Sequence, residues 1–164
     1  MFAELTYDRR GVGPGGQIFG EQARLFEDKL NYKPPRIGSA FKLHQDQPYW
    51  DGFSERLISV FLHLDDADAG NGCLKVLPGC QNLGVLEFVT DGPDRTIVDE
   101  RIAGVELLEM EMDAGDLLIF SSFTPHASEI NRSDRVRRAM VYTYHPVSEG
   151  ELYRYSAEVL GTYH

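Results

Sequence analysis

Three side chains able to bind a metal stand far apart in this sequence, and any fold that uses them must bring two distant segments together. His44 and Asp46 are separated by one residue, and His126 follows about 80 residues later. Two histidines and one carboxylate hold one face of an iron(II) ion and leave the other coordination positions open for a co-substrate and O2. The pattern therefore predicts a non-haem iron centre.

The first part of this pattern lies in a segment that is expected to be a strand. Apolar and polar residues alternate from position 41 to position 46, and side chains two residues apart on a strand share a face. His44 and Asp46 are therefore expected to point at the same metal, whereas Gln45 is expected to face away from it.

An arginine follows the second histidine at the start of another apolar segment, residues 138–144. A connection over residues 128–134 would bring Arg137 back towards His126. Guanidinium groups bind carboxylates bidentately, so Arg137 is the expected partner of the far carboxylate of a dicarboxylic co-substrate, which points to 2-oxoglutarate. Strand alternation sends Arg138 to the opposite face.

Short apolar segments separated by turn residues follow position 35 and are typical of a β-barrel or sandwich. Before them, residues 21–30 carry apolar side chains at helical spacing and predict a short amphipathic helix, whereas the glycine-rich residues 11–16 are expected to form a flexible loop. Asn71-Gly72 has the composition of a hairpin turn. The other expected elements are strands at residues 57–64, 73–77, 84–90, 96–101 and 105–112, an apolar strand from Leu117, and a loop at residues 91–94.

Five stretches, taken in order, resemble the catalytic core of the phytanoyl-CoA dioxygenase family. They are residues 33–35, 44–50, 71–79 and 115–120, and His126-Ala127-Ser128 with Asn131, Ser133 and Arg137. The resemblance implies a mainly β fold, a double-stranded β-helix of the jelly-roll or cupin-like type with a short N-terminal helix. It also implies Fe(II), 2-oxoglutarate and O2, and hydroxylation of a C–H bond in a small-molecule or acyl substrate with release of succinate and CO2.

The same resemblance assigns roles to individual residues. His44, Asp46 and His126 match the iron ligands, and Arg137 matches the residue that pairs with the tail of 2-oxoglutarate. By resemblance alone, Ser128 is expected to assist Arg137, and Lys33 to contact the co-substrate or the substrate. Halogenating relatives replace the carboxylate ligand by a small residue, so the presence of Asp46 favours hydroxylation.

The chain is expected to be one domain over residues 1–164, with an N-terminal loop and helix at residues 1–32 and a catalytic core at residues 33–146. Family members usually carry a longer N-terminal region that braces the barrel. A shorter one would expose apolar surface, which soluble monomers rarely leave open. Residues 11–30 could fold over that surface, a second copy could cover it, or the chain could be part of a longer protein. Of these we expect a symmetric homodimer, with Phe19, Leu25 and Phe26 in or near the contact.

Two other functions stay open at this point. One is a metal-binding cupin-like module, or a partner subunit, that does not oxidise 2-oxoglutarate. The other is a different metalloenzyme on the same barrel that ignores 2-oxoglutarate, and such an enzyme would have no use for Arg137.

Charge and composition exclude several classes of partner. The net charge of −10 opposes binding to nucleic acid, which needs basic patches. An apolar run near 18 residues is absent, so no membrane span is expected, and the first residues lack the pattern of a secretory leader. Cys73 and Cys80 are expected to be reduced thiols. Together these features predict a cytoplasmic protein.

Overall fold

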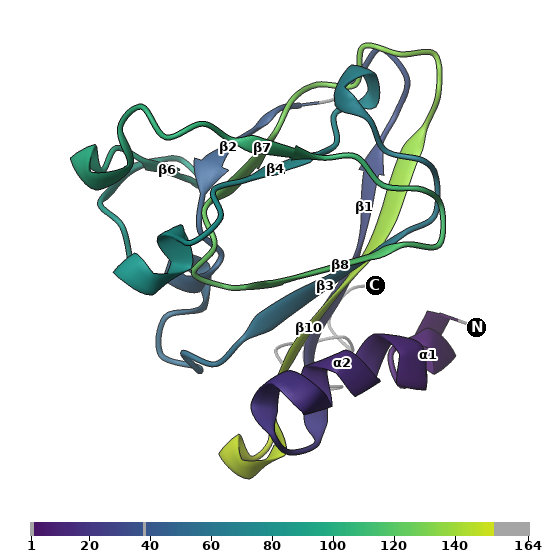
Figure 1. Ribbon diagram of the computed structural model, residues 1–164, viewed down its shortest axis with the longest axis vertical. Helices are drawn as coiled ribbons and strands as arrows, with labels where there is room; N and C mark the ends of the chain where they lie inside the picture. Colours follow the sequence, from purple (N-terminus) through teal and green to yellow (C-terminus); the bar gives the residue numbers. More distant parts are fainter. Residues whose placement is uncertain (1, 38, 153–164) are drawn as a thin grey trace.

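Two four-stranded antiparallel sheets face each other in the computed structural model, which describes residues 2–37 and 39–152 (Figure 1). The first sheet has the order β1 (Ala23–Lys33), β10 (Arg137–Pro146), β3 (Ile58–His63), β8 (Leu117–Ser121). The second has the order β2 (Phe41–His44), β9 (His126–Ser128), β4 (Leu74–Val76), β7 (Leu108–Met110). This arrangement confirms the predicted jelly-roll.

Smaller elements connect the sheets. A separate hairpin is formed by β5 (Phe88–Asp91) and β6 (Asp94–Ile97). Single turns of 3₁₀ helix are η1 (Gln47–Trp50), η2 (Ala69–Asn71), η3 (Cys80–Leu83), η4 (Glu100–Ile102) and η5 (Val147–Glu149). Two α-helices, α1 (Phe2–Leu5) and α2 (Arg9–Phe19), precede the barrel.

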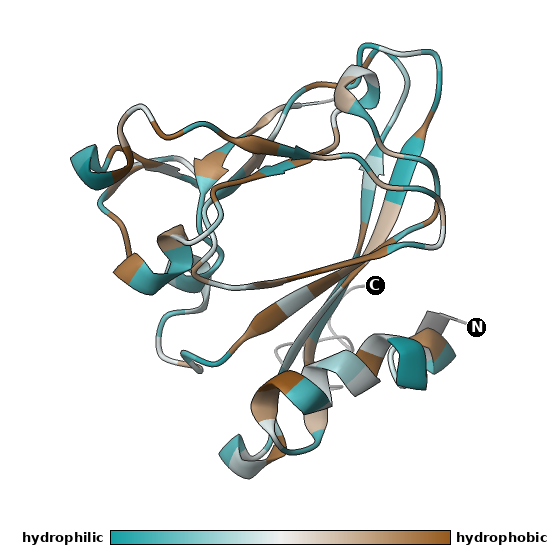
Figure 2. Ribbon diagram, viewed as in Figure 1, coloured by the Kyte–Doolittle hydropathy of each residue, from teal (hydrophilic) through white to brown (hydrophobic). Residues whose placement is uncertain are grey.

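Apolar side chains fill the space between the two sheets and also cover the outer face of the first one. Hydrophobic residues run along β3 and β8 (Figure 2). The inner cluster consists of Phe61, Leu74, Val76, Phe120, Ala139 and Val141. The outer cluster consists of Leu25, Ile58, Val60, Met140, Tyr142 and Tyr144. Because strand side chains alternate between faces, β3 and β10 contribute to both clusters.

Helix α2 covers the outer cluster. The Asp8 side chain accepts a hydrogen bond from the Arg10 amide at 2.9 Å and caps the start of the helix. Gly20 ends the helix with φ of 71°, a left-handed conformation that favours glycine. Val12 and Phe19 pack against the outer cluster. The barrel sheet is therefore braced from within the chain.

Both predictions for the N-terminal segment are wrong in secondary structure. Residues 21–30 form most of strand β1 instead of a helix, and residues 11–16 lie inside α2 instead of forming a loop. Glycine and proline disfavour helix by about 1 and 3 kcal/mol, but close packing on the sheet overrides this preference. A Cβ placed on Gly15 would come within 3.3 Å of Ala23 Cβ and Ile58 Cδ1, so the glycine lets the helix approach.

The apparent helical spacing in residues 21–30 comes from a bulge. The register of β1 against β10 shifts between Leu25 and Glu27, and a bulge interrupts the period-two alternation of a strand. Leu25 and Phe26 are both buried within their own chain, so their predicted place in a dimer contact is not supported. The homodimer itself stays a prediction. The boundary predicted at residue 33 falls at the end of a barrel strand.

The hairpin predicted at Asn71-Gly72 is also wrong. Strands β3 and β4 belong to different sheets, so the chain crosses between them. Gly72 has φ of 76°, and a Cβ there would lie 2.4 Å from the Glu129 carbonyl oxygen. The strand predicted at residues 57–64 is confirmed as β3. The strands predicted at residues 84–90, 96–101 and 105–112 correspond to β5, β6 and β7, and each observed strand is shorter than predicted. The turn at residues 91–94 is confirmed.

Two further predictions concern the thiols and the membrane. Cys73 is buried, Cys80 is half-buried, and both are free thiols. Within residues 2–37 and 39–152, no helix has the length and apolar character needed to span a membrane.

The contact between the N-terminal segment and the barrel can be tested at Tyr144. Its buried hydroxyl donates a hydrogen bond to the Thr6 carbonyl at 2.7 Å. Tyr144→Phe should lower the free energy of unfolding by about 1 kcal/mol, the usual net value of one hydrogen bond, as measured by urea denaturation. Tyr7→Phe is the matched control, because Tyr7 is 69% exposed. Equal effects of the two substitutions would contradict this contact.

Candidate metal centre

The two histidines meet because their strands are neighbours. In the pairing of β2 with β9, His44 lies directly opposite His126, and opposed side chains on one face of a sheet are in contact range. The ring centroids are 4.2 Å apart. The prediction that distant segments bring these residues together is confirmed.

Asp46 reaches the same point from beyond the strand. Strand β2 ends at His44, and Asp46 has helical dihedrals (φ −72°, ψ −35°) at the start of η1. The expectation that His44 and Asp46 share a strand face is therefore wrong, although the convergence is correct. Ser59 Oγ donates to Asp46 Oδ2 at 3.2 Å, and Asp46 Oδ1 lies 3.9 Å from Nε2 of both histidines.

Backbone carbonyls set the tautomer of each histidine. Nδ1 of His44 lies 2.7 Å from the Lys42 oxygen, and Nδ1 of His126 lies 2.9 Å from the Thr124 oxygen. A carbonyl can only accept, so Nδ1 carries the proton and Nε2 keeps its lone pair. Burial lowers the pKa of His126 to about 4, which keeps the ring neutral, as a metal ligand must be.

These three side chains fit an iron(II) site. Their ligand atoms all lie within 4.8 Å of one another. Two imidazole nitrogens and one carboxylate oxygen on one side form the facial set that non-haem iron uses.

Two supporting residues escaped the sequence interpretation. Gln45 does face away from the metal set, but it is buried, and it donates to the Gly84 oxygen at 2.9 Å and to the Phe123 oxygen at 2.6 Å. Ser59 holds Asp46. Both are polar residues in stretches of the sequence that become buried on folding. A buried polar group needs a hydrogen-bond partner, so a polar residue in such a stretch is the signal that could have identified them.

Arg137 is a buried cation beside the metal set. Its Nη2 donates to the Gly72 oxygen at 2.9 Å, and its Nε has no hydrogen-bond partner. Among the described residues, no carboxylate forms a salt bridge with it, and burial lowers the pKa of its guanidinium. Arg137 lines one pocket with the metal set and Ser128. An unpaired buried charge is costly, so this geometry suits an anionic ligand.

Lys33 lies next to Arg137, as its register partner on β1. Its Nζ donates to the Ser39 oxygen at 3.2 Å and to the Glu129 oxygen. Burial, reinforced by the charge of Arg137, lowers the pKa of Lys33 to about 8. Two buried cations thus lie side by side, and Arg137 is the one that lines the pocket.

Arg138 points outward, as predicted. Its guanidinium is bound by both carboxylate oxygens of Asp65 at 2.8 Å. It lies on the same strand as Arg137 but on the opposite face, so it does not line the pocket.

A jelly-roll barrel with two histidines and one aspartate at one end is the architecture of the non-haem iron oxygenases. Residues 7–139 match the family model described as Phytanoyl-CoA dioxygenase (PhyH). The chain belongs to this family, whose members use Fe(II), 2-oxoglutarate and O2. The predicted membership of the phytanoyl-CoA dioxygenase family is therefore confirmed.

Two curated relatives are similar in sequence to most of this chain. A 2-aminoethylphosphonate dioxygenase of Uncultured bacterium HF130_AEPn_1 is 39% identical over 85% of this chain and 52% of its own length. A methylphosphonate hydroxylase of Gimesia maris is 35% identical over 84% of this chain and 51% of its own. The chain thus spans about half the length of these curated relatives.

A solved structure supports the fold. The crystal structure of EctD from S. alaskensis with bound Fe superposes with a TM-score of 0.74 at 25% identity. The match covers 90% of this chain and 53% of that one.

Removing any one of the three candidate ligands should abolish tight metal binding. His44→Ala, Asp46→Ala and His126→Ala should each weaken Fe(II) binding by at least about tenfold, because even residues that only support ligands contribute that much. Anaerobic calorimetry measures the affinity. His145→Gln is the control, since this buried histidine lies at the Pro146 carbonyl, outside the site. Full affinity in any ligand variant would exclude that residue from the metal set.

Proposed function

We propose that this chain forms the iron and co-substrate site of a 2-oxoglutarate-dependent oxygenase. The enzyme would hydroxylate a C–H bond of a small molecule and release succinate and CO2. The observation that carries the proposal is the buried guanidinium of Arg137, which forms no salt bridge with any described residue and lines the same pocket as His44, Asp46 and His126. A metal centre without 2-oxoglutarate has no need of such a cation.

Each residue of the site would have a distinct task. His44, Asp46 and His126 would hold Fe(II). The bound iron would supply the chemistry by which O2 oxidises both 2-oxoglutarate and the substrate. Arg137 would bind the 5-carboxylate of 2-oxoglutarate through a charge-assisted pair.

Further residues in and around the pocket support the same assignment. Ser128, buried in the pocket beside Arg137, would add a hydroxyl donor to the same carboxylate. Lys33 would add a second positive charge. Ser59 and Gln45 hold the ligand segment in position through their hydrogen bonds.

The relatives favour one class of substrate. Both curated relatives are named for oxidation of a small organophosphonate, so a compound of that kind is the first substrate to test. An acyl substrate is a second candidate, through the family description.

A metal-binding module or partner subunit without oxidation of 2-oxoglutarate is the alternative. It is kept because the chain spans only about half of its relatives' length. Metal binding without succinate formation would favour it.

The test begins with the chain under anaerobic conditions. Addition of Fe(II) and 2-oxoglutarate should produce a visible metal-to-ligand charge-transfer band, and admission of O2 should yield succinate. Arg137→Ala should raise the apparent dissociation constant for 2-oxoglutarate by one to two orders of magnitude, since a hydrogen bond to a charged group contributes about 1.5–3 kcal/mol.

Arg138→Ala is the matched control, because Arg138 is paired with Asp65 on the other face. Its apparent constant for 2-oxoglutarate should equal that of the unmodified chain. A larger effect of Arg138→Ala than of Arg137→Ala would contradict the assignment, and the absence of both band and succinate would contradict the function.

The pKa of Lys33 predicts how the affinity for 2-oxoglutarate depends on pH. With a pKa of about 8, Lys33 is charged below pH 8 and loses its proton above it. Only the charged form attracts a carboxylate, so affinity for 2-oxoglutarate should fall as pH rises above 8, by at most about tenfold per pH unit. Lys33→Met should bind more weakly at pH 7 and show a flatter profile, as measured by the band. An unchanged profile in Lys33→Met would exclude Lys33.

A further inference from the structure

A second pocket adjoins the pocket of Arg137 at the candidate metal ligands. The two pockets share Lys29, Phe41, His44 and Asp46, but Arg137 lines only the first. Its wall carries three cations, which are Lys29, Lys42 and Arg95. The same wall carries three carboxylates, those of Glu27, Asp46 and Asp94, so a cation is available to a ligand only where no carboxylate pairs with it.

The β5–β6 hairpin is held against β2 at this pocket. Lys42 on β2 lies with its Nζ 3.3 Å from Asp91 and 3.1 Å from Asp94, both on the hairpin. The charge of Lys42 is therefore used within the protein, and the hairpin that carries Arg95 is fixed to the strand that carries His44.

Of the three cations, Arg95 is the one left for a ligand. The Nζ of Lys29 lies 3.3 Å from a carboxylate oxygen of Glu27. Arg95 forms no salt bridge with any residue that the structure describes. Arg95 is half-buried.

Tyr49 positions Arg95 in two ways. The Arg95 amide donates to the Tyr49 hydroxyl at 2.7 Å, and Arg95 Cζ lies 4.8 Å from the centroid of the Tyr49 ring. The Phe88 ring lies 5.8 Å away from the same Cζ. A stacked guanidinium keeps its edge free to bind an anion with two parallel hydrogen bonds.

The same tyrosine also connects Arg95 to the metal set. The Tyr49 and His44 ring centroids are 6.0 Å apart, so the ring that stacks with the guanidinium also packs against a candidate metal ligand. An anion held by Arg95 would lie in the pocket that His44 and Asp46 line.

We infer that Arg95 is the binding residue for an anionic group of the substrate. The substrate is then a small acid with a carboxylate or phosphate-like group. This inference rests on the proposed function, because it places the substrate in the pocket next to the one that would hold the co-substrate. It assigns Arg137 and Arg95 to two different anions.

The test measures binding without turnover. The chain is loaded with Ni(II), a redox-inactive substitute for iron, and with 2-oxoglutarate to occupy Arg137, and inorganic phosphate and propionate are each titrated by calorimetry. Arg95→Gln should weaken binding of the preferred anion by about ten- to a hundredfold, the loss expected for a charge-assisted pair. Preference for phosphate or for propionate supports the site either way and identifies the anionic group.

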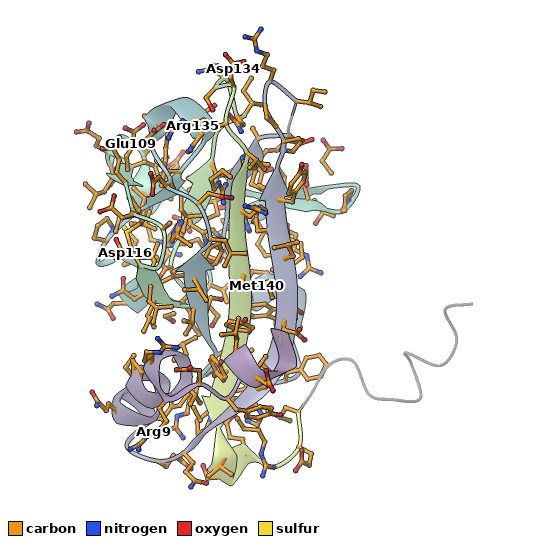
Figure 3. The ribbon with its side chains drawn as sticks, turned by 90° about the vertical axis from the view of Figure 1, so that its right-hand side faces the viewer. Arg9, Glu109, Asp116, Asp134, Arg135 and Met140 are labelled. Carbon is orange, nitrogen blue, oxygen red and sulfur yellow. The ribbon has the colours of Figure 1, made fainter. Side chains whose placement is uncertain are left out.

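Arg9→Gln is the matched control. It removes the same charge from the exposed start of α2, at the end of the molecule opposite to Asp134 and Arg135 (Figure 3), and it should bind the anion as the unmodified chain does. Equal affinity of Arg95→Gln and the unmodified chain, or no binding of either anion to the unmodified chain, would overturn the inference.

A failure of the proposed function can be distinguished from a failure of this inference, because the Ni(II)-loaded chain would then not bind 2-oxoglutarate. In that case the two anions are titrated into the metal-free chain, with Arg137→Ala alongside Arg95→Gln. Weaker binding only in Arg95→Gln supports the site, and weaker binding only in Arg137→Ala overturns it.

Discussion

The pairing of β2 with β9 is the constraint on which the rest of the site depends. Its register sets His44 opposite His126, so the two imidazoles meet on one face without help from a loop. A slip of one residue would turn each side chain to the other face of the sheet and separate them. The third donor, Asp46, arrives because β2 ends at His44 and the chain turns into η1.

Burial determines which of the polar groups around the candidate metal ligands still need a partner. Gln45 and Ser59 have protein partners for their side-chain hydrogen bonds, so they stabilise the site as it stands. Arg137 and Lys33 are buried without a salt bridge among the described residues, and a charge removed from water is costly unless it is compensated. On the proposed function, the co-substrate carboxylate provides that compensation.

Much of the site could be predicted from the sequence, but the N-terminal segment could not. The metal set and the opposite orientations of Arg137 and Arg138 follow from residue chemistry and strand alternation. The predictions for β1 and α2 are wrong, because a bulge near Leu25 interrupts the alternation of the strand and the close approach at Gly15 makes a glycine-rich helix stable. Both causes are contacts between segments distant in sequence.

The sequence by itself determined the class of fold, the donor types at the metal and the cation opposite them, since apolar spacing and side-chain chemistry are local properties. Only the tertiary structure decided that Asp46 caps η1 with helical dihedrals, that Lys33 stands beside Arg137, and that Arg95 has no acidic partner among the residues described. The reason is physical: register, burial and ion pairing depend on which distant residues become neighbours, and no local pattern specifies them.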